Sequence, residues 1–78
     1  MKTYDECKKI AEEYTEGNVF SVNTAYEGKD AFVFDNDKET FAGFVPFVVD
    51  KTTGAITNLW HYLNSANLTM DDFKEITY

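Results

Sequence analysis

Apolar residues at three- and four-residue spacing open the chain and predict an amphipathic helix. Thr3 and Glu6 have the types and spacing of a capping box, and Gly17-Asn18 supplies a stop signal. We therefore expect the helix at about residues 3–16. Its apolar stripe consists of Tyr4, Cys7, Ile10, Ala11 and Tyr14.

Two segments that predict strands follow this helix. Residues 19–26 alternate in the manner of a half-buried strand. Residues 31–35 predict a second strand with Phe32 and Phe34 on the same face. The polar segment between them, residues 27–30, contains a glycine and predicts a turn.

An apolar segment at residues 44–50 forms the centre of the predicted sheet. It is apolar on both faces, which is typical of a strand buried on both sides. The next four residues predict a tight turn with Gly54 at positive φ. Residues 55–60 then predict the return strand, and we expect Trp60 at its end to lie in the core, with a place in a binding interface as the alternative.

The pattern is weaker after this strand, although Thr69 has the type and position to cap a short helix that reaches about Ile76. The sequence thus predicts one α+β domain over residues 1–78. In it, the N-terminal helix packs on a four-stranded antiparallel meander, followed by a short C-terminal helix. The second face of the sheet exposes Val33 and Leu59 unless the C-terminal segment or a partner covers it.

The charge of the chain limits its partners. Fourteen acidic residues against seven basic ones give a formal net charge of −7. This charge repels the phosphates of nucleic acids, which proteins meet with Lys and Arg, and attracts basic surfaces. It also keeps a small protein in solution, with or without a basic partner. We expect no nucleic-acid partner.

The location follows from what the composition lacks. There is no apolar run of about 18 residues, so we expect no membrane span. A single cysteine excludes an intrachain disulfide, and the first residues lack the apolar core of a secretion signal. These features favour a cytoplasmic protein.

Few residues have the setting of a catalytic or metal site. His61 is the only histidine and Cys7 the only cysteine, whereas a zinc site takes several such ligands. Cys7 lies on the apolar stripe beside acidic residues, which favours packing over a reactive thiolate. The adjacent acids Glu12-Glu13 point in different directions on a helix. We therefore expect no enzymatic activity, no metal and no other cofactor.

Four segments resemble the immunity protein 35 (YrhB-like) family. They are the helix segment Ala11-Glu12-Glu13-Tyr14, the aromatic strand Ala31-Phe32-Val33-Phe34, the element Gly43-Phe44-Val45-Pro46 and the hairpin Phe47-Val48-Val49-Asp50-Lys51-Thr52-Thr53-Gly54. The resemblance implies a non-enzymatic bacterial protein encoded beside a secreted or contact-dependent toxin. Such a protein binds the effector domain of the toxin in the cytoplasm of the producing cell and blocks it.

On this hypothesis, acidic loops and a nearby aromatic ring bind a toxin that has a basic surface. The candidate partner-binding residues are Asp30, Asp35, Asp37 and Tyr62. Two alternatives remain open. One is a phage-encoded acidic inhibitor that mimics DNA by using carboxylates in place of phosphates. The other is a homodimeric structural domain that buries the second sheet face against a second copy.

Overall fold

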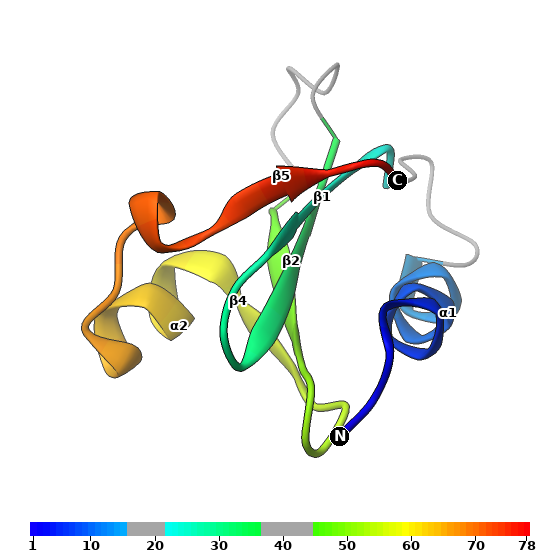
Figure 1. Ribbon diagram of the computed structural model, residues 1–78, viewed down its shortest axis with the longest axis horizontal. Coiled ribbons are helices and arrows are strands. Elements are labelled where there is room, and N and C mark those ends of the chain that lie inside the picture. Colours follow the sequence, from blue (N-terminus) through cyan, green and yellow to red (C-terminus); the bar gives the residue numbers. More distant parts are fainter. Residues whose placement is uncertain (16–21, 37–44) are drawn as a thin grey trace.

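The computed structural model describes residues 1–15, 22–36 and 45–78 of the chain. Within these ranges the fold is α+β, with two α-helices and one five-stranded antiparallel sheet of strand order β4-β3-β2-β1-β5 (Figure 1). The elements in chain order are α1 (Tyr4–Thr15), β1 (Thr24–Glu27), β2 (Ala31–Asp35), β3 (Phe47–Asp50), β4 (Ile56–Asn58), α2 (Leu59–Ala66), the single 3-10 turn η1 (Met70–Asp72) and β5 (Lys74–Ile76). The α+β class is confirmed, and β1 to β4 are ordered as a meander, but the sheet has five strands where the sequence predicted four.

The helix α1 begins where the capping box predicted. The Thr3 N–H donates to the Glu6 carboxylate at 2.9 Å, and the Glu6 N–H donates to the Thr3 hydroxyl at 3.2 Å. Hydrogen bonding of the Glu6 carboxylate with Thr3, mainly with its backbone N–H, lowers the pKa of Glu6. The stripe of α1 covers one face of the sheet, where Cys7 and Ala11 are fully buried against Phe34 and neighbouring residues. The predicted packing of the first helix on the sheet is therefore correct.

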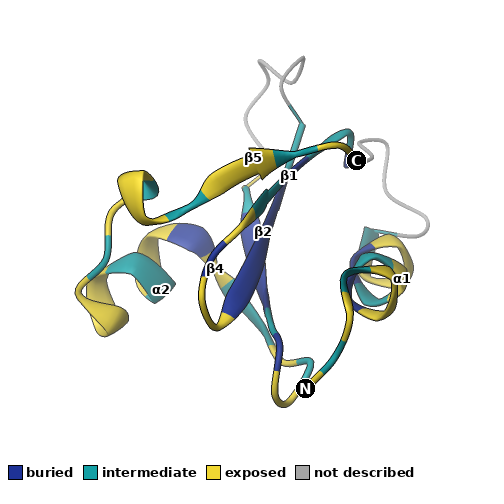
Figure 2. Cartoon of the chain, in the orientation of Figure 1, coloured by how far each residue is buried: buried dark blue, intermediate teal, exposed yellow. Residues whose placement is uncertain are grey.

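The strands differ from the prediction mainly in length. The central strand β2 is buried along most of its length (Figure 2), and Phe32 and Phe34 share the face toward α1 as expected. The first strand, β1, is shorter than predicted, with Ala25 packed under α1 and Tyr26 on the opposite face. The predicted helix stop at residues 17–18 and the predicted strand residues 19–21 lie outside the described residues.

The predicted return strand at residues 55–60 ends early, and Trp60 is not in the core. Asn58 is the N-cap of α2: its side-chain oxygen accepts hydrogen bonds from the N–H groups of Trp60, at 2.8 Å, and His61, at 3.2 Å. This cap starts a helix directly after three strand residues. As a result, the Trp60 side chain lies on the outside of α2, with 60% of its surface exposed.

The predicted C-terminal helix is replaced by one 3-10 turn and a strand. Thr69 and Asp72 do form a capping box, with the Thr69 N–H donating to the Asp72 carboxylate at 2.9 Å. The helix ends there because Phe73 is extended and β5 pairs antiparallel with the open edge of β1. Ladder pairing along β1 outweighs the helical pattern that extends to Ile76.

The second face of the sheet is covered within the chain. Val33 and Val48 of the sheet are buried there against Leu59, the first residue of α2, and beneath the segment around η1. The helices α1 and α2 thus lie on opposite sides of the sheet (Figure 1). The exposed apolar face that motivated the homodimer alternative is closed by the C-terminal segment, which was one of the two covers that we expected.

Candidate protein-binding surface

The acidic residues predicted to bind a partner do not lie together. Asp30 is exposed in the turn between β1 and β2, whereas Asp35 is half-buried at the far end of β2. Five strand residues span roughly 16 Å, so one compact contact cannot centre on both carboxylates. Asp37 lies outside the described residues.

Tyr62 lies on α2 and packs mainly against the second core. Its ring meets the ring of Phe73 edge-on, with the centroids 6.4 Å apart. Burial, with smaller contributions from Asp30 and Asp50, raises the pKa of the Tyr62 phenol. Tyr62 is half-buried and offers a partner only part of its ring.

The acids on the Asp30 side of the sheet take part in the fold. The Asp50 carboxylate accepts hydrogen bonds from the N–H groups of Thr52, at 2.7 Å, and Thr53, at 2.9 Å, and so holds the β3–β4 turn. Glu27 accepts a hydrogen bond from the Lys51 ammonium group at 3.0 Å. This end of the sheet is consequently not a free carboxylate cluster.

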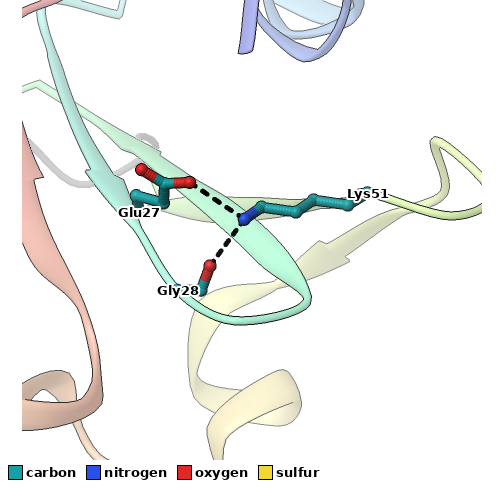
Figure 3. A network of polar contacts seen from close by, with 3 residues as sticks. All are labelled: Glu27, Gly28 and Lys51. Carbon is teal, nitrogen blue, oxygen red and sulfur yellow. Dashed lines mark hydrogen bonds and ion pairs between the residues drawn. The ribbon is translucent and has the colours of Figure 1, made fainter. Parts of the chain in front are cut away.

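Lys51 connects the two turns at this end (Figure 3). Its buried ammonium group donates to the Gly28 carbonyl at 2.8 Å and lies 4.7 Å from the centroid of the Phe32 ring. Its backbone N–H donates to the Asp30 carbonyl at 2.9 Å. The lysine thus positions the turn that carries Asp30, and it is a structural residue.

A surface without charged residues lies on the β4–α2 side. Residues 52–70 contain no Asp, Glu, Lys or Arg, although 27% of the whole chain is charged. Five residues of α2 are exposed, Ala66 among them. The other four share one side of the helix, and we call them the α2 surface: Trp60, His61, Asn64 and Ser65. Interfaces between proteins are depleted of charge at their centres and enriched in Trp and Tyr, so this surface shares the lack of charge and the exposed Trp of an interface centre.

The α2 surface is held firmly to the sheet. The Leu59 N–H donates to the Pro46 carbonyl at 3.0 Å, which ties the first residue of α2 to the chain just before β3. Val45, beside Pro46, is 46% exposed and adds an apolar side chain at this end. Sequence reasoning missed the α2 surface because it placed Trp60 in a strand; the uncharged run of residues 52–70 was the available signal.

The described residues were also compared with the requirements of other kinds of site. None of their His, Cys, Asp and Glu side chains gather in groups of three or more that could hold a metal ion. A shallow pocket between β1 and β5 has Glu75 as its only carboxylate side chain among the described lining residues. No described helix has the length and apolar character needed to cross a membrane.

Comparison with known proteins leaves the sequence and the fold as the basis for a functional proposal. No family model, curated protein or solved structure matches this chain.

Proposed function

We propose that this protein is an immunity-type binding module that neutralises a bacterial toxin by binding its effector domain in the cytoplasm, without catalysis of its own. The class of partner is suggested by the resemblance of the helix and hairpin segments to the immunity protein 35 family. The net charge of −7 favours a toxin with a basic surface.

The observation that carries the proposal is the exposure of Trp60 within the uncharged α2 surface. A single exposed apolar side chain is ordinary, but a tryptophan ring loses a large apolar area from water when a partner covers it. Trp is also the residue type most enriched among those that dominate binding energy. The side-chain cap at Asn58 fixes the start of the helix that carries this ring, so little backbone order has to be gained on binding.

In this proposal the acidic residues attract the partner from a distance, whereas the sequence predicted that they form the contact. Because Asp30 and Asp35 lie at opposite ends of β2, they act through the field of the whole protein. Such a field accelerates the approach of a basic partner and is screened by salt. Binding then has two separable components: acids set the association rate, and the α2 surface sets the dissociation rate.

The test is binding to the effector domain of the toxin encoded beside this gene. We expect Trp60→Ala to weaken the complex about 30-fold, because removal of a dominant interface residue costs about 2 kcal/mol or more. Tyr14→Ala is the matched control, since Tyr14 is a similarly exposed aromatic residue, on α1. An effector domain that does not bind the unmodified protein refutes the proposed function.

A further inference from the structure

The two edges of the sheet differ in charge. The edge strand β5 carries Lys74 and Glu75, and charged side chains on an edge discourage pairing with another strand. The opposite edge strand, β4, has the sequence Ile56-Thr57-Asn58 and carries no charge. Of the two edges of the sheet in the described residues, only the β4 edge therefore lacks charged side chains.

The register shows which backbone groups of β4 face outward. The Leu59 N–H donates to the Pro46 carbonyl at 3.0 Å, and the Asp50 N–H donates to the Ala55 carbonyl at 2.9 Å. In an antiparallel ladder the hydrogen-bonded pairs alternate, so the next such pair between these two is Val48 with Thr57. The N–H and C=O groups of Ile56 and the N–H group of Asn58 consequently point away from β3.

The outward edge of β4 is continuous with the α2 surface. Asn58 ends the strand and caps the helix, and Trp60 follows two residues later with 60% of its surface exposed. A chain segment that pairs with Ile56 and Asn58 therefore extends toward the ring of Trp60. The strand β4 and the exposed side of α2 carry no Asp, Glu, Lys or Arg. They therefore repel neither an acidic nor a basic segment.

We propose that the β4 edge binds an extended basic segment of the toxin as a sixth strand, with Trp60 packed over one of its side chains. This inference rests on the proposed function and specifies how the partner is held. An added strand gains main-chain hydrogen bonds from the edge and specificity from alternate side chains. The net charge of −7 selects a segment rich in Lys or Arg over a second copy of this acidic chain.

Because β4 is only three residues long, its edge contributes only part of the binding affinity. Two residues offer outward backbone groups, so the pairing fixes the direction and register of the segment. The ring of Trp60 and the charge of the protein supply the rest of the affinity. This division makes the backbone contribution measurable by one substitution.

Ile56→Pro removes the outward N–H group and leaves the ladder between β3 and β4 intact, because proline is tolerated on an edge strand. Ile56→Ala is the matched control: it shortens the same half-buried side chain and keeps the N–H group. Against the effector domain of the neighbouring toxin, we expect Ile56→Pro to bind about 5- to 100-fold more weakly than Ile56→Ala. This range corresponds to leaving a partner carbonyl unpaired.

Amide hydrogen exchange in the unmodified protein provides a second measurement that needs no variant. We expect the effector domain to slow exchange of the Ile56 and Asn58 amides and to leave the amides of β5 unchanged. Equal binding of both variants without this protection overturns the inference and leaves the proposed function standing. If the unmodified protein does not bind the effector domain, the inference and the proposed function are both overturned. If self-association protects the same amides in the free protein, the choice of partner is overturned.

Discussion

Replacing Lys51 with methionine tests whether the lysine network holds the turns together. The substitution keeps an unbranched apolar side chain of similar length and removes the ammonium group. That group is buried, with only 10% of the side chain exposed, and donates to the Gly28 carbonyl at 2.8 Å and to Glu27 at 3.0 Å. It also faces the ring of Phe32 at 4.7 Å.

The expected loss follows from these three contacts. A hydrogen bond from a charged donor contributes about 1.5–3 kcal/mol, and the bond to the Gly28 carbonyl is of this kind. The pair with Glu27 adds about 0.2–1 kcal/mol, because half of the Glu27 side chain is exposed and its charge is screened. The contact with Phe32 adds about 0.5–2 kcal/mol. Relief from burying a charge offsets part of this sum, so we expect the free energy of unfolding to fall by about 2 kcal/mol.

Thermal unfolding followed by circular dichroism measures the change. For a domain of this size, about 2 kcal/mol corresponds to a fall in Tm of about 8–16 °C. Glu27→Gln is the matched control, since it removes the charge of the acceptor and keeps the Gly28 bond, and we expect its effect to stay below about 1 kcal/mol. Equal effects of the two variants, or an unchanged Tm for Lys51→Met, would refute the structural role assigned to the ammonium group.

Three further predictions concern the packing of the chain. Gly28→Ala places a methyl group against the ring of Phe73 and should lower the free energy of unfolding by about 1–3 kcal/mol in urea titrations; Phe73→Leu, which makes room, should reduce this loss in the double variant. Burial, followed by a hydrogen bond to Glu12, raises the pKa of Tyr78 to about 12, above its ordinary value of 10.0. As the pH rises, the phenol of Tyr78 therefore loses its proton in the unfolded chain before it does so in the folded protein. The free energy of unfolding should fall between pH 10 and 12, and it should fall by less in Tyr78→Phe. Equal dependence of stability on pH in the two proteins would contradict this. Cys7 is fully buried, and burial raises the pKa of its thiol. A thiol reagent should therefore label Cys7 only as fast as the protein unfolds. Fast labelling of the native protein would show that the reagent reaches the core without unfolding.

The parts of the fold that local chemistry determines could be predicted from the sequence. The capping box of Thr3 and Glu6, the apolar stripe of α1 and the shared face of Phe32 and Phe34 all depend on residue spacing. Gly54 has a φ of 78°, as its place in the turn predicts. Each of these features follows from neighbours within a few positions along the chain.

The predictions that were wrong concern contacts between segments that are far apart in the sequence. The pairing of β5 with β1 joins residues about 50 positions apart, and no local pattern indicates that this edge of β1 is available. The change from β4 to α2 was missed because Asn58 reads equally well as a strand residue and as a helix cap. That single misplacement moved Trp60 from the surface to the predicted core.

The α2 surface was harder to predict than the fold because its distinguishing feature is that it lacks charged residues. Acidic residues draw attention in a chain with a net charge of −7, yet Asp50 serves the turn and Asp30 and Asp35 lie apart. The uncharged run of residues 52–70 acquires meaning only when α2 places part of it on the outside of the molecule. Surface position, which determines whether an uncharged residue belongs to the core or to an interface, depends on the whole fold.

Trp60 allows the most direct test of the account, because it is the only tryptophan in the chain. Incorporation of 5-fluorotryptophan gives a single fluorine resonance that reports on the α2 surface alone. On titration with the effector domain of the neighbouring toxin, we predict that this resonance shifts in proportion to the complex formed and that its sensitivity to solvent is lost. A complex in which the resonance and its solvent sensitivity stay unchanged would contradict the claim that the α2 surface binds the partner.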